Sequence, residues 1–278
     1  MKKKYIVDLS EVKLSDLELV GGKNASLGEM IQNIGKLGVN IPGGFAITVE
    51  AYWEFIRHNN LDKKIRSLMA EMIKEDLVSL RKTGLKIRQI IRNGDWPEDL
   101  KTEIKESYSL LSQKYDQEMT DVAVRSSATA EDLPDASFAG QQETYLNVRG
   151  PEQILSSVRN CFASLFTDRA ISYRDTFKFD HFDVGLSVCV QKMVRSDLAS
   201  SGVAFSLDTE SGFKDVVLIN GAYGLGEMVV QGTVSPDEFL VYKPTLKDGY
   251  KSIIEKKMGR KENKMIYSTD PGKLVKTV

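Results

Sequence analysis

Two hydrophobic periodicities alternate along the chain and divide it into regions. Apolar residues near helical spacing predict helices over residues 25–37, 50–118 and 152–173. Short apolar runs bounded by Gly, Pro, Asn or Asp predict strands at 4–9, 45–49, 122–124, 144–148, 186–190, 202–205, 216–220 and 239–242. Strands dominate from residue 185. We therefore predict two lobes: residues 1–184, with a helical insertion at about 50–118, and residues 185–278.

The composition is that of an ordinary globular chain. The 278 residues are 41% hydrophobic and 28% charged, which excludes a disordered tail, a collagen-like rod and a disulfide-rich mini-protein. Lys and Arg number 38 against 39 Asp and Glu, so the formal net charge is -1 and no overall field would attract nucleic acid or an anionic membrane. The first apolar run ends at Asp8, too early for a signal peptide. We expect a cytoplasmic protein with no nucleic-acid or membrane partner.

Cysteine and histidine are too scarce for a zinc site. The chain has Cys161 and Cys189, far apart in sequence, and His58 and His181. A site built from Cys and His needs closely spaced ligands, which this set cannot supply. Both cysteines lie in apolar stretches, so we predict buried, reduced thiols.

Residues 21–24 (GGKN) form a predicted turn just before a helix. Lys23 would then lie in the first helical turn, where the helix dipole is already positive. A bound anion would relieve this conflict, because helix N-termini bind phosphate readily. The spacing of a Walker loop is absent. The alternative is a solvated lysine after an ordinary glycine turn.

Arg125 directly follows a predicted strand, at a strand end that a ligand could reach. Residues 126–142 then form a long segment rich in small and polar side chains, in which Ser126, Ser127 and Thr129 supply hydroxyl groups. Backbone N–H groups in such a segment can approach a ligand, and the guanidinium fork suits polyphosphate. The segment is long enough for a lid over a nucleotide. The alternative is a long surface loop beside a solvent-facing arginine.

Two later segments add weaker candidates. Gln191 follows the predicted strand 186–190, and its amide could read the edge of a purine, although a plain strand is the alternative. Glu227 follows a glycine-containing turn at residues 221–226, which lacks the third glycine of a dinucleotide-binding motif. Its carboxylate could face a ribose or a metal, or it could cap the next helix.

Taken together, these segments resemble the N-terminal nucleotide-binding part of the phosphoenolpyruvate synthase (pyruvate, water dikinase) family. The motifs are residues 20–29 (VGGKNASLGE), 124–132 (VRSSATAED), 137–141 (SFAGQ), 220–227 (NGAYGLGE) and 235–237 (SPD). The similarity spans nearly the whole chain. Rifamycin phosphotransferases share these motifs, and pyruvate, phosphate dikinase shares them more loosely. Residues 242–246, 258–261 and 264–267 favour the synthase.

The resemblance implies an α+β fold of the ATP-grasp type, with ATP held between two lobes and the fold incomplete at the C-terminus. It implies that Lys23 and Arg125 are catalytic and contact the ATP phosphates, that the segment 126–142 covers these phosphates, and that residues 191–194 lie at the adenine. The residues that it places at ATP are Lys23, Arg125, Ser126, Ser127, Thr129, Gln141, Gln191, Met193, Val194 and Glu227.

The family reaction forms phosphoenolpyruvate, AMP and phosphate from pyruvate, ATP and water. A histidine on a separate swivelling domain is pyrophosphorylated, loses phosphate to water and passes the remaining phosphoryl group to pyruvate, and Mg²⁺ is expected to neutralise charge on the transferring groups. Neither His58 nor His181 lies in that domain's motif. The residues that hold Mg²⁺ in the family would follow Val278, so the sequence itself identifies no metal ligand.

These departures predict that the chain is one part of a longer enzyme. Its expected partners are ATP and the phosphohistidine and pyruvate-binding domains, which the resemblance places elsewhere. We expect the chain alone not to form phosphoenolpyruvate. The alternatives are the ATP-binding portion of a rifamycin phosphotransferase and a non-catalytic nucleotide-binding module.

Overall fold

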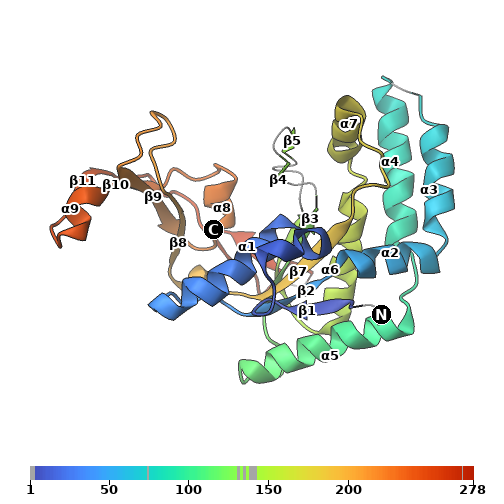
Figure 1. The fold of residues 1–278 in the computed structure, drawn as a ribbon, viewed down its shortest axis with the longest axis horizontal. Helices are drawn as coiled ribbons and strands as arrows, with labels where there is room; N and C mark the ends of the chain where they lie inside the picture. The colour runs from blue at the N-terminus through green and yellow to red at the C-terminus, as the bar shows by residue number, and fades with distance from the viewer. Residues whose placement is uncertain (1–3, 74, 130–131, 134–135, 138–142, 271) are drawn as a thin grey trace. The chain divides into compact units, whose positions relative to one another are not determined.

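The computed structural model describes residues 4–73, 75–129, 132–133, 136–137, 143–270 and 272–278. It mixes helices and sheets, as an α+β fold does, and divides into two compact units, Met1–Met193 and Val194–Val278 (Figure 1). Each unit is described by itself. Gln141 and most of the predicted lid segment lie outside the described residues.

The first unit is built on a five-stranded antiparallel sheet in the order β1-β2-β7-β3-β6. Its strands are β1 (Ile6–Asp8), β2 (Gly44–Ile47), β3 (Val122–Ala128), β6 (Thr144–Val148) and β7 (Leu186–Lys192). Two short strands, β4 (Asp132–Leu133) and β5 (Ala136–Ser137), pair with each other. The two central strands, β7 and β3, are buried along nearly their whole length, so the sheet forms the centre of this unit.

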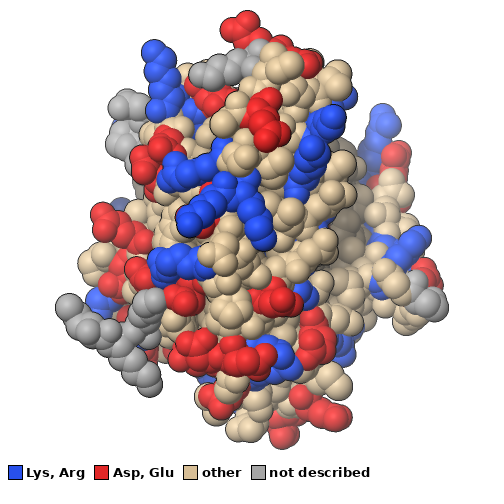
Figure 2. All heavy atoms as spheres, turned by 90° about the vertical axis from the view of Figure 1, so that its right-hand side faces the viewer, with Lys and Arg blue, Asp and Glu red and all other residues tan. Residues whose placement is uncertain are grey.

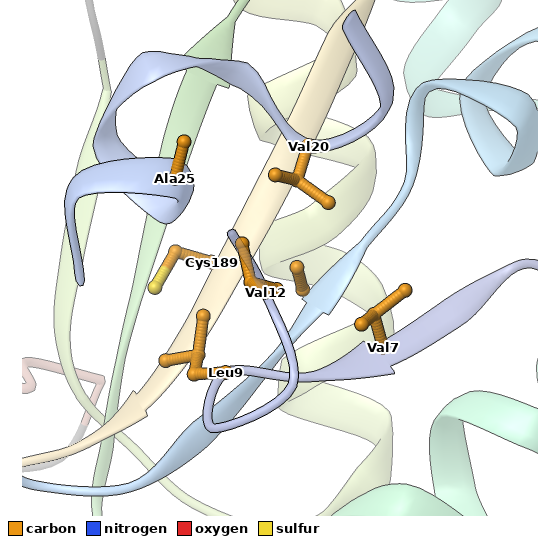
Figure 3. Close-up of a cluster of buried hydrophobic side chains, with 7 residues drawn as sticks. Val7, Leu9, Val12, Val20, Ala25 and Cys189 are labelled. Carbon is orange, nitrogen blue, oxygen red and sulfur yellow. The ribbon is translucent and has the colours of Figure 1, made fainter. Parts of the chain in front are cut away.

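The first unit also contains helices, some of which pack directly on this sheet. They are α1 (Leu17–Asn33), α2 (Val49–His58), α3 (Leu61–Ala70), α4 (Leu77–Arg92), α5 (Glu98–Lys114), α6 (Pro151–Ser164) and α7 (Asp168–Phe177), with short 3-10 turns η1 (Leu14–Asp16) and η2 (Gly35–Leu37). Helix α1 packs on β3 and β7, where a cluster of buried apolar side chains surrounds Cys189 (Figure 3). Helix α6 packs on the opposite face, against β3, β6 and β7. Tyr145 of β6 and Cys161 of α6 interact there.

Helices α2 to α5 occupy the region in which helices were predicted at 50–118. Helix α2 begins at Thr48, whose side chain accepts a hydrogen bond from the backbone N–H of Ala51, the usual role of a threonine N-cap. The aromatic rings of Phe55, Trp96 and Phe162 pack with centroids 5.0–6.1 Å apart, which joins the insertion to α6. Lys, Arg, Asp and Glu side chains all occur on the face that carries α3 and α4 (Figure 2).

The second unit contains a four-stranded antiparallel sheet in the order β11-β10-β9-β8. Its elements are η3 (Ser196–Leu198), β8 (Ser200–Phe205), β9 (Val216–Tyr223), α8 (Glu227–Val230), β10 (Asp237–Tyr242), α9 (Lys243–Lys247), β11 (Ile253–Lys257), β12 (Met265–Tyr267) and β13 (Val275–Thr277). Strands β12 and β13 pair separately. Among the described residues, no helix is long and apolar enough to cross a membrane.

Three local predictions differ from the structure. Strand β7 pairs with β2 and β3, so the compact first unit extends to Met193 instead of ending before residue 185. Arg125 does not follow its strand but lies within β3, which continues to Ala128 because β7 pairs with it along its whole length. Helical structure begins at Leu17 instead of residue 25, since Gly21 allows a kink inside α1.

Candidate functional site

The kink in α1 brings this helix against β3. Gly21 has φ 73° and ψ 164°, a conformation that only glycine adopts readily. A Cβ atom at this position would lie 2.4 Å from the carbonyl oxygen of Ser127 and 2.5 Å from its Oγ. The absence of a side chain therefore permits direct contact between α1 and β3. The second segment of α1 starts at this contact, with the exposed side chain of Lys23 in its first turn.

Asn24 fixes the start of that segment to the sheet. Its side chain is fully buried, and its Nδ2 donates hydrogen bonds to the carbonyl oxygen of Val20 at 2.9 Å and to Ser187 Oγ at 3.0 Å. The backbone N–H of Asn24 donates to Ser127 Oγ at 3.4 Å. These bonds join α1 to both central strands, β3 and β7.

Strand alternation places Arg125 on the face of the sheet that α1 covers. Arg125 lies opposite Cys189 across the β3–β7 pair, and Cys189 belongs to the apolar cluster beneath α1. Side chains two residues apart in a strand share a face. Ser127 therefore lies on the same face as Arg125, as does Gln191 of β7.

Gln191 orients the guanidinium of Arg125. Arg125 Nη1 donates to Gln191 Oε1 at 3.4 Å, and Gln191 Nε2 donates to the carbonyl oxygen of Pro42 at 3.0 Å. Gln191 is 6% exposed, whereas Arg125 is half-buried. The buried amide of Gln191 therefore restrains one nitrogen of the guanidinium, while the half-buried Arg125 side chain stays partly accessible to solvent.

Cys189 is a buried thiol beneath α1, and the charges of Lys23 and Arg125 both affect its pKa. Burial raises the pKa of the Cys189 thiol to about 11, while the positive charges of Arg125 and Lys23 both act to lower it. Burial also raises the pKa of Cys161, and Lys23 acts against that rise. The Cys189 side chain on β7 lies near Val20 and Ala25 of α1 (Figure 3). Lys23 directly precedes Asn24, whose backbone N–H bonds Ser127, two residues from Arg125 on the same face of β3.

Ser126, Ser127 and Thr129 are engaged in hydrogen bonds within the fold. Ser126 is fully buried, faces away from Arg125, and donates to the carbonyl oxygen of Glu143 at 3.4 Å. Ser127 is also fully buried, against Gly21. The prediction that both serines belong to a covering loop is wrong, because both lie in β3. Thr129 follows the strand and donates to the carbonyl oxygen of Gly185 from both its backbone N–H and its hydroxyl.

The remaining predicted residues lie at the end of the first unit and in the second. Met193 is 8% exposed, and its backbone N–H donates to the carbonyl oxygen of Asp121 at 3.0 Å. Val194 opens the second unit with an exposed side chain. Glu227 is the first residue of α8, and its Oε1 accepts a hydrogen bond from Gln231 at 2.8 Å.

The sequence reasoning did not single out Asn24 as a positioning group, and it overlooked Ser187. Ser187 was detectable as a polar residue inside an otherwise apolar strand. Its Oγ donates to the carbonyl oxygen of Ile47 at 2.7 Å, so it joins β7 to β2. Buried hydroxyls inside a sheet are normally hydrogen-bonded. A polar interruption of a buried strand therefore indicated a bonded group at this point.

The described residues contain no group of three or more His, Cys, Asp or Glu side chains placed to hold a metal ion. Both cysteines are buried and neither forms a disulfide, which confirms the predicted thiols. His181 accepts from the buried Arg174 at Nδ1 (2.9 Å), and its Nε2 lies 3.2 Å from Asp175 Oδ1. Both ring nitrogens of His181 are thus engaged.

The chain is similar in sequence to known proteins. The sequence model described as "pyruvate phosphate dikinase, AMP/ATP-binding domain" matches residues 17–278. The phosphoenolpyruvate synthase of Aquifex aeolicus is 60% identical over 267 residues, which are 96% of this chain and 31% of that protein. The synthases of Synechocystis sp. and Escherichia coli are 56% and 52% identical, over 98% and 96% of this chain and 34% of each relative.

The matched region is a part of each of these relatives. This chain spans about a third of their length. The family model, in contrast, covers nearly all of the chain, including the segments that carry Lys23, Arg125 and Gln191. The chain therefore belongs to the pyruvate phosphate dikinase AMP/ATP-binding domain family.

Proposed function

We propose that the chain binds ATP as the nucleotide-binding part of a phosphoenolpyruvate synthase, and that Lys23 and Arg125 hold the ATP phosphates. The observation that carries this proposal is the arrangement of these two cations. They come from α1 and β3 and are 102 positions apart in sequence. Asn24, which follows Lys23, bonds through its backbone N–H to Ser127, two residues from Arg125 on the same face of β3. Two cations beside a kinked helix and its N–H groups form a suitable environment for a polyphosphate.

The two cations would contribute different chemistry. A guanidinium presents several N–H donors in a fixed plane and can contact two phosphate oxygens at once, whereas an ammonium is a compact charge on a flexible stem. Gln191 restrains Arg125, so this side chain would set the orientation of the phosphates. Lys23 is exposed and would follow the charge as phosphoryl transfer proceeds.

The finer description of the nucleotide site belongs to this proposal as well. We infer an ATP-grasp fold that holds ATP between two lobes, with the adenine near Met193 and Val194 at the end of β7. The Gln191 amide is engaged by Pro42 and Arg125, so backbone groups after Gln191 would read the purine. Glu227 is the candidate that the second unit would contribute.

Mg²⁺ belongs to the proposal for the complete enzyme. The described residues supply no cluster able to hold it, and Mg²⁺ in such enzymes is commonly bound through substrate phosphates and one or two carboxylates. The roles assigned to Lys23 and Arg125 are independent of any metal ligand in this chain.

In the complete enzyme, we propose that ATP pyrophosphorylates a histidine outside this chain, leading to phosphoenolpyruvate, AMP and phosphate. His181 is engaged at both ring nitrogens, and His58 lies at the C-terminal end of α2, within the helical insertion. No hydrogen bond or ion pair joins either histidine to Arg125 among the described residues, so neither is indicated as the phosphoryl acceptor. The relatives named above are phosphoenolpyruvate synthases, which favours this reaction over antibiotic phosphorylation.

Calorimetric titration with ATP and Mg²⁺ tests the proposal. Replacing Arg125 with alanine removes a charge-assisted contact to phosphate, so Arg125→Ala should weaken ATP binding by about 1.5–3 kcal/mol, which is about a 10- to 100-fold rise in Kd. Arg81→Ala is the matched control, because it removes an exposed arginine from α4. Unchanged ATP affinity in folded Arg125→Ala, or an equal loss in the control, would contradict the proposal.

A further inference from the structure

Asn24 and its hydrogen-bond partners link α1 to three strands of the sheet, and we call this set of bonds the bracket. Its Nδ2 bonds Val20 within α1 and Ser187 of β7, and its backbone N–H bonds Ser127 of β3. Ser187 in turn donates to the carbonyl oxygen of Ile47 in β2. The first turn of the second α1 segment is therefore attached at one residue to β3 and β7 directly and to β2 through one hydroxyl.

The bracket lies next to both proposed phosphate-binding cations. Asn24 follows Lys23 directly in sequence. Its partner Ser127 is two residues from Arg125 on the same face of β3, a separation of about 6–7 Å along an extended strand. The bond from Asn24 to Ser127 consequently sets the position of the Lys23 backbone relative to the strand that carries Arg125.

The second arm of the bracket reaches the strand that orients the arginine. Ser187 and Gln191 lie on one face of β7, and Gln191 accepts the hydrogen bond from Arg125. The bond from Asn24 to Ser187 thus attaches α1 to β7, the strand whose Gln191 bonds the Arg125 guanidinium. Asn24 therefore contacts β3, which carries Arg125, through its backbone N–H, and β7, which carries Gln191, through its side-chain amide.

An asparagine at this point is poorly explained by folding stability alone. Asn24 is fully buried, and its Oδ1 has no hydrogen-bond partner among the described residues. A buried polar atom without a partner costs desolvation free energy that an apolar side chain of similar size would avoid. The value of the amide therefore lies in the geometry that its donor bonds impose.

We propose that Asn24 is a positioning residue for ATP binding, which holds the Lys23 ammonium at a set distance from the Arg125 guanidinium so that both reach one triphosphate. This inference rests on the proposed function. Asn24 itself does not touch ATP, and its effect on affinity passes through Lys23.

A double-mutant cycle on ATP affinity tests this role. Asn24→Ala should raise the Kd for ATP about tenfold in the parent chain, because misplaced binding groups lose much of their contribution. In a Lys23→Ala background the same change should alter Kd by less than about twofold, since the group that Asn24 positions is gone. A general loss of structure would instead lower affinity by the same factor in both backgrounds.

Ser187→Ala provides a second variant if Asn24→Ala folds poorly. It removes the acceptor of the Asn24 bond from the strand side and leaves α1 unchanged, so it should weaken ATP binding in the same Lys23-dependent way. Ser164→Ala is the matched control: Ser164 is another buried serine, whose hydroxyl donates to the carbonyl oxygen of Cys161. This control should leave ATP affinity unchanged.

A measurement without ATP separates this inference from the proposed function. The rate at which an amine-reactive acylating reagent modifies Lys23, mapped by mass spectrometry and normalised to the exposed Lys36, should change in Asn24→Ala and not in Ser164→Ala. An unchanged Lys23 rate, or equal ATP effects in both backgrounds, would overturn the positioning role. If Arg125→Ala leaves the Kd for ATP unchanged while Asn24→Ala changes the Lys23 acylation rate, only the proposed function is contradicted.

Discussion

Residues 21–24 and residues 221–227 each place glycines just before a helical segment and a charged side chain, Lys23 in the first case and Glu227 in the second. Each turn contains a glycine with positive φ, 73° at Gly21 and 82° at Gly224. A Cβ at either position would lie about 2.5 Å or less from a backbone oxygen of a distant segment. The two turns therefore share one physical requirement, a close approach of two backbones.

The segment on the other side of each contact makes the turns different. Gly21 meets Ser127 of β3, the strand that carries Arg125. Gly224 instead meets Met265 of β12, and the N–H of Leu225 donates to the carbonyl oxygen of Met265. Glu227 then accepts a hydrogen bond from Gln231, the residue that follows α8. A glycine motif thus indicates close packing, and only the opposing residues indicate whether a ligand-binding group is nearby.

Gly21→Ala should produce the largest effect on the first turn. The new Cβ would combine an unfavourable backbone conformation with a clash against Ser127, so the free energy of unfolding should fall by about 3–4 kcal/mol. Urea unfolding followed by circular dichroism measures this change. Gly35→Ala is the control, because no atom lies within 4 Å of its Cβ position. A fall of less than 1 kcal/mol would contradict the close approach of α1 to β3.

The buried thiol beneath the first turn gives a pH-dependent prediction. The folded chain raises the pKa of Cys189 from 9.0 to about 11, so the folded state retains the proton that the unfolded state loses first. The stability due to the neutral thiol is complete below pH 9 and should be lost as the pH rises toward 11, by about 2 kcal/mol. Unfolding measured from pH 8 to 11 should show a smaller decline for Cys189→Ala than for the parent.

Other buried groups serve as an internal reference in that experiment. Burial also raises the pKa of Cys161, Tyr52 and Tyr145, and these groups are present in both proteins. The comparison therefore depends on the difference between the two declines. Equal declines would show that Cys189 lies in a more solvated environment than the apolar cluster around it indicates.

Gln231→Ala should have the smallest effect and tests the second turn. The pair between Gln231 and Glu227 is an exposed contact between the first residue of α8 and the residue that follows this helix, four positions apart, and such pairs contribute about 0.2–0.5 kcal/mol. Thermal unfolding should thus change only slightly. A loss above about 1.5 kcal/mol would mean that the Gln231 side chain contributes more than an exposed local pair.

Much of the fold was predictable because its hydrophobic periodicity is regular. The strand 144–148 and the helical insertion agree with the structure, since buried faces recur at fixed intervals there. The continuation of β3 beyond Val124 was not predictable. Ser126 and Ser127 have loop-forming composition, but pairing with β7 and burial by α1 outweigh this local preference.

The two cations of the candidate site could be proposed from the sequence, but the buried residues that attach their elements to each other could not. Lys23 stood out because it follows a glycine turn, and Arg125 because it precedes a long polar segment. The pairing of Asn24 with Ser187, in contrast, joins residues 163 positions apart. No local pattern fixes which buried amide meets which buried hydroxyl. The two cations could thus be proposed from their local segments and from the family resemblance, whereas the bracket that joins their elements required the structure.

A structure of the chain with a non-hydrolysable ATP analogue and Mg²⁺ tests the central claim most directly. We predict phosphate oxygens within hydrogen-bonding distance of both Lys23 Nζ and the Arg125 guanidinium, with the bond from Asn24 to Ser187 retained. Phosphates bound at another surface, with neither cation in contact, would contradict the account.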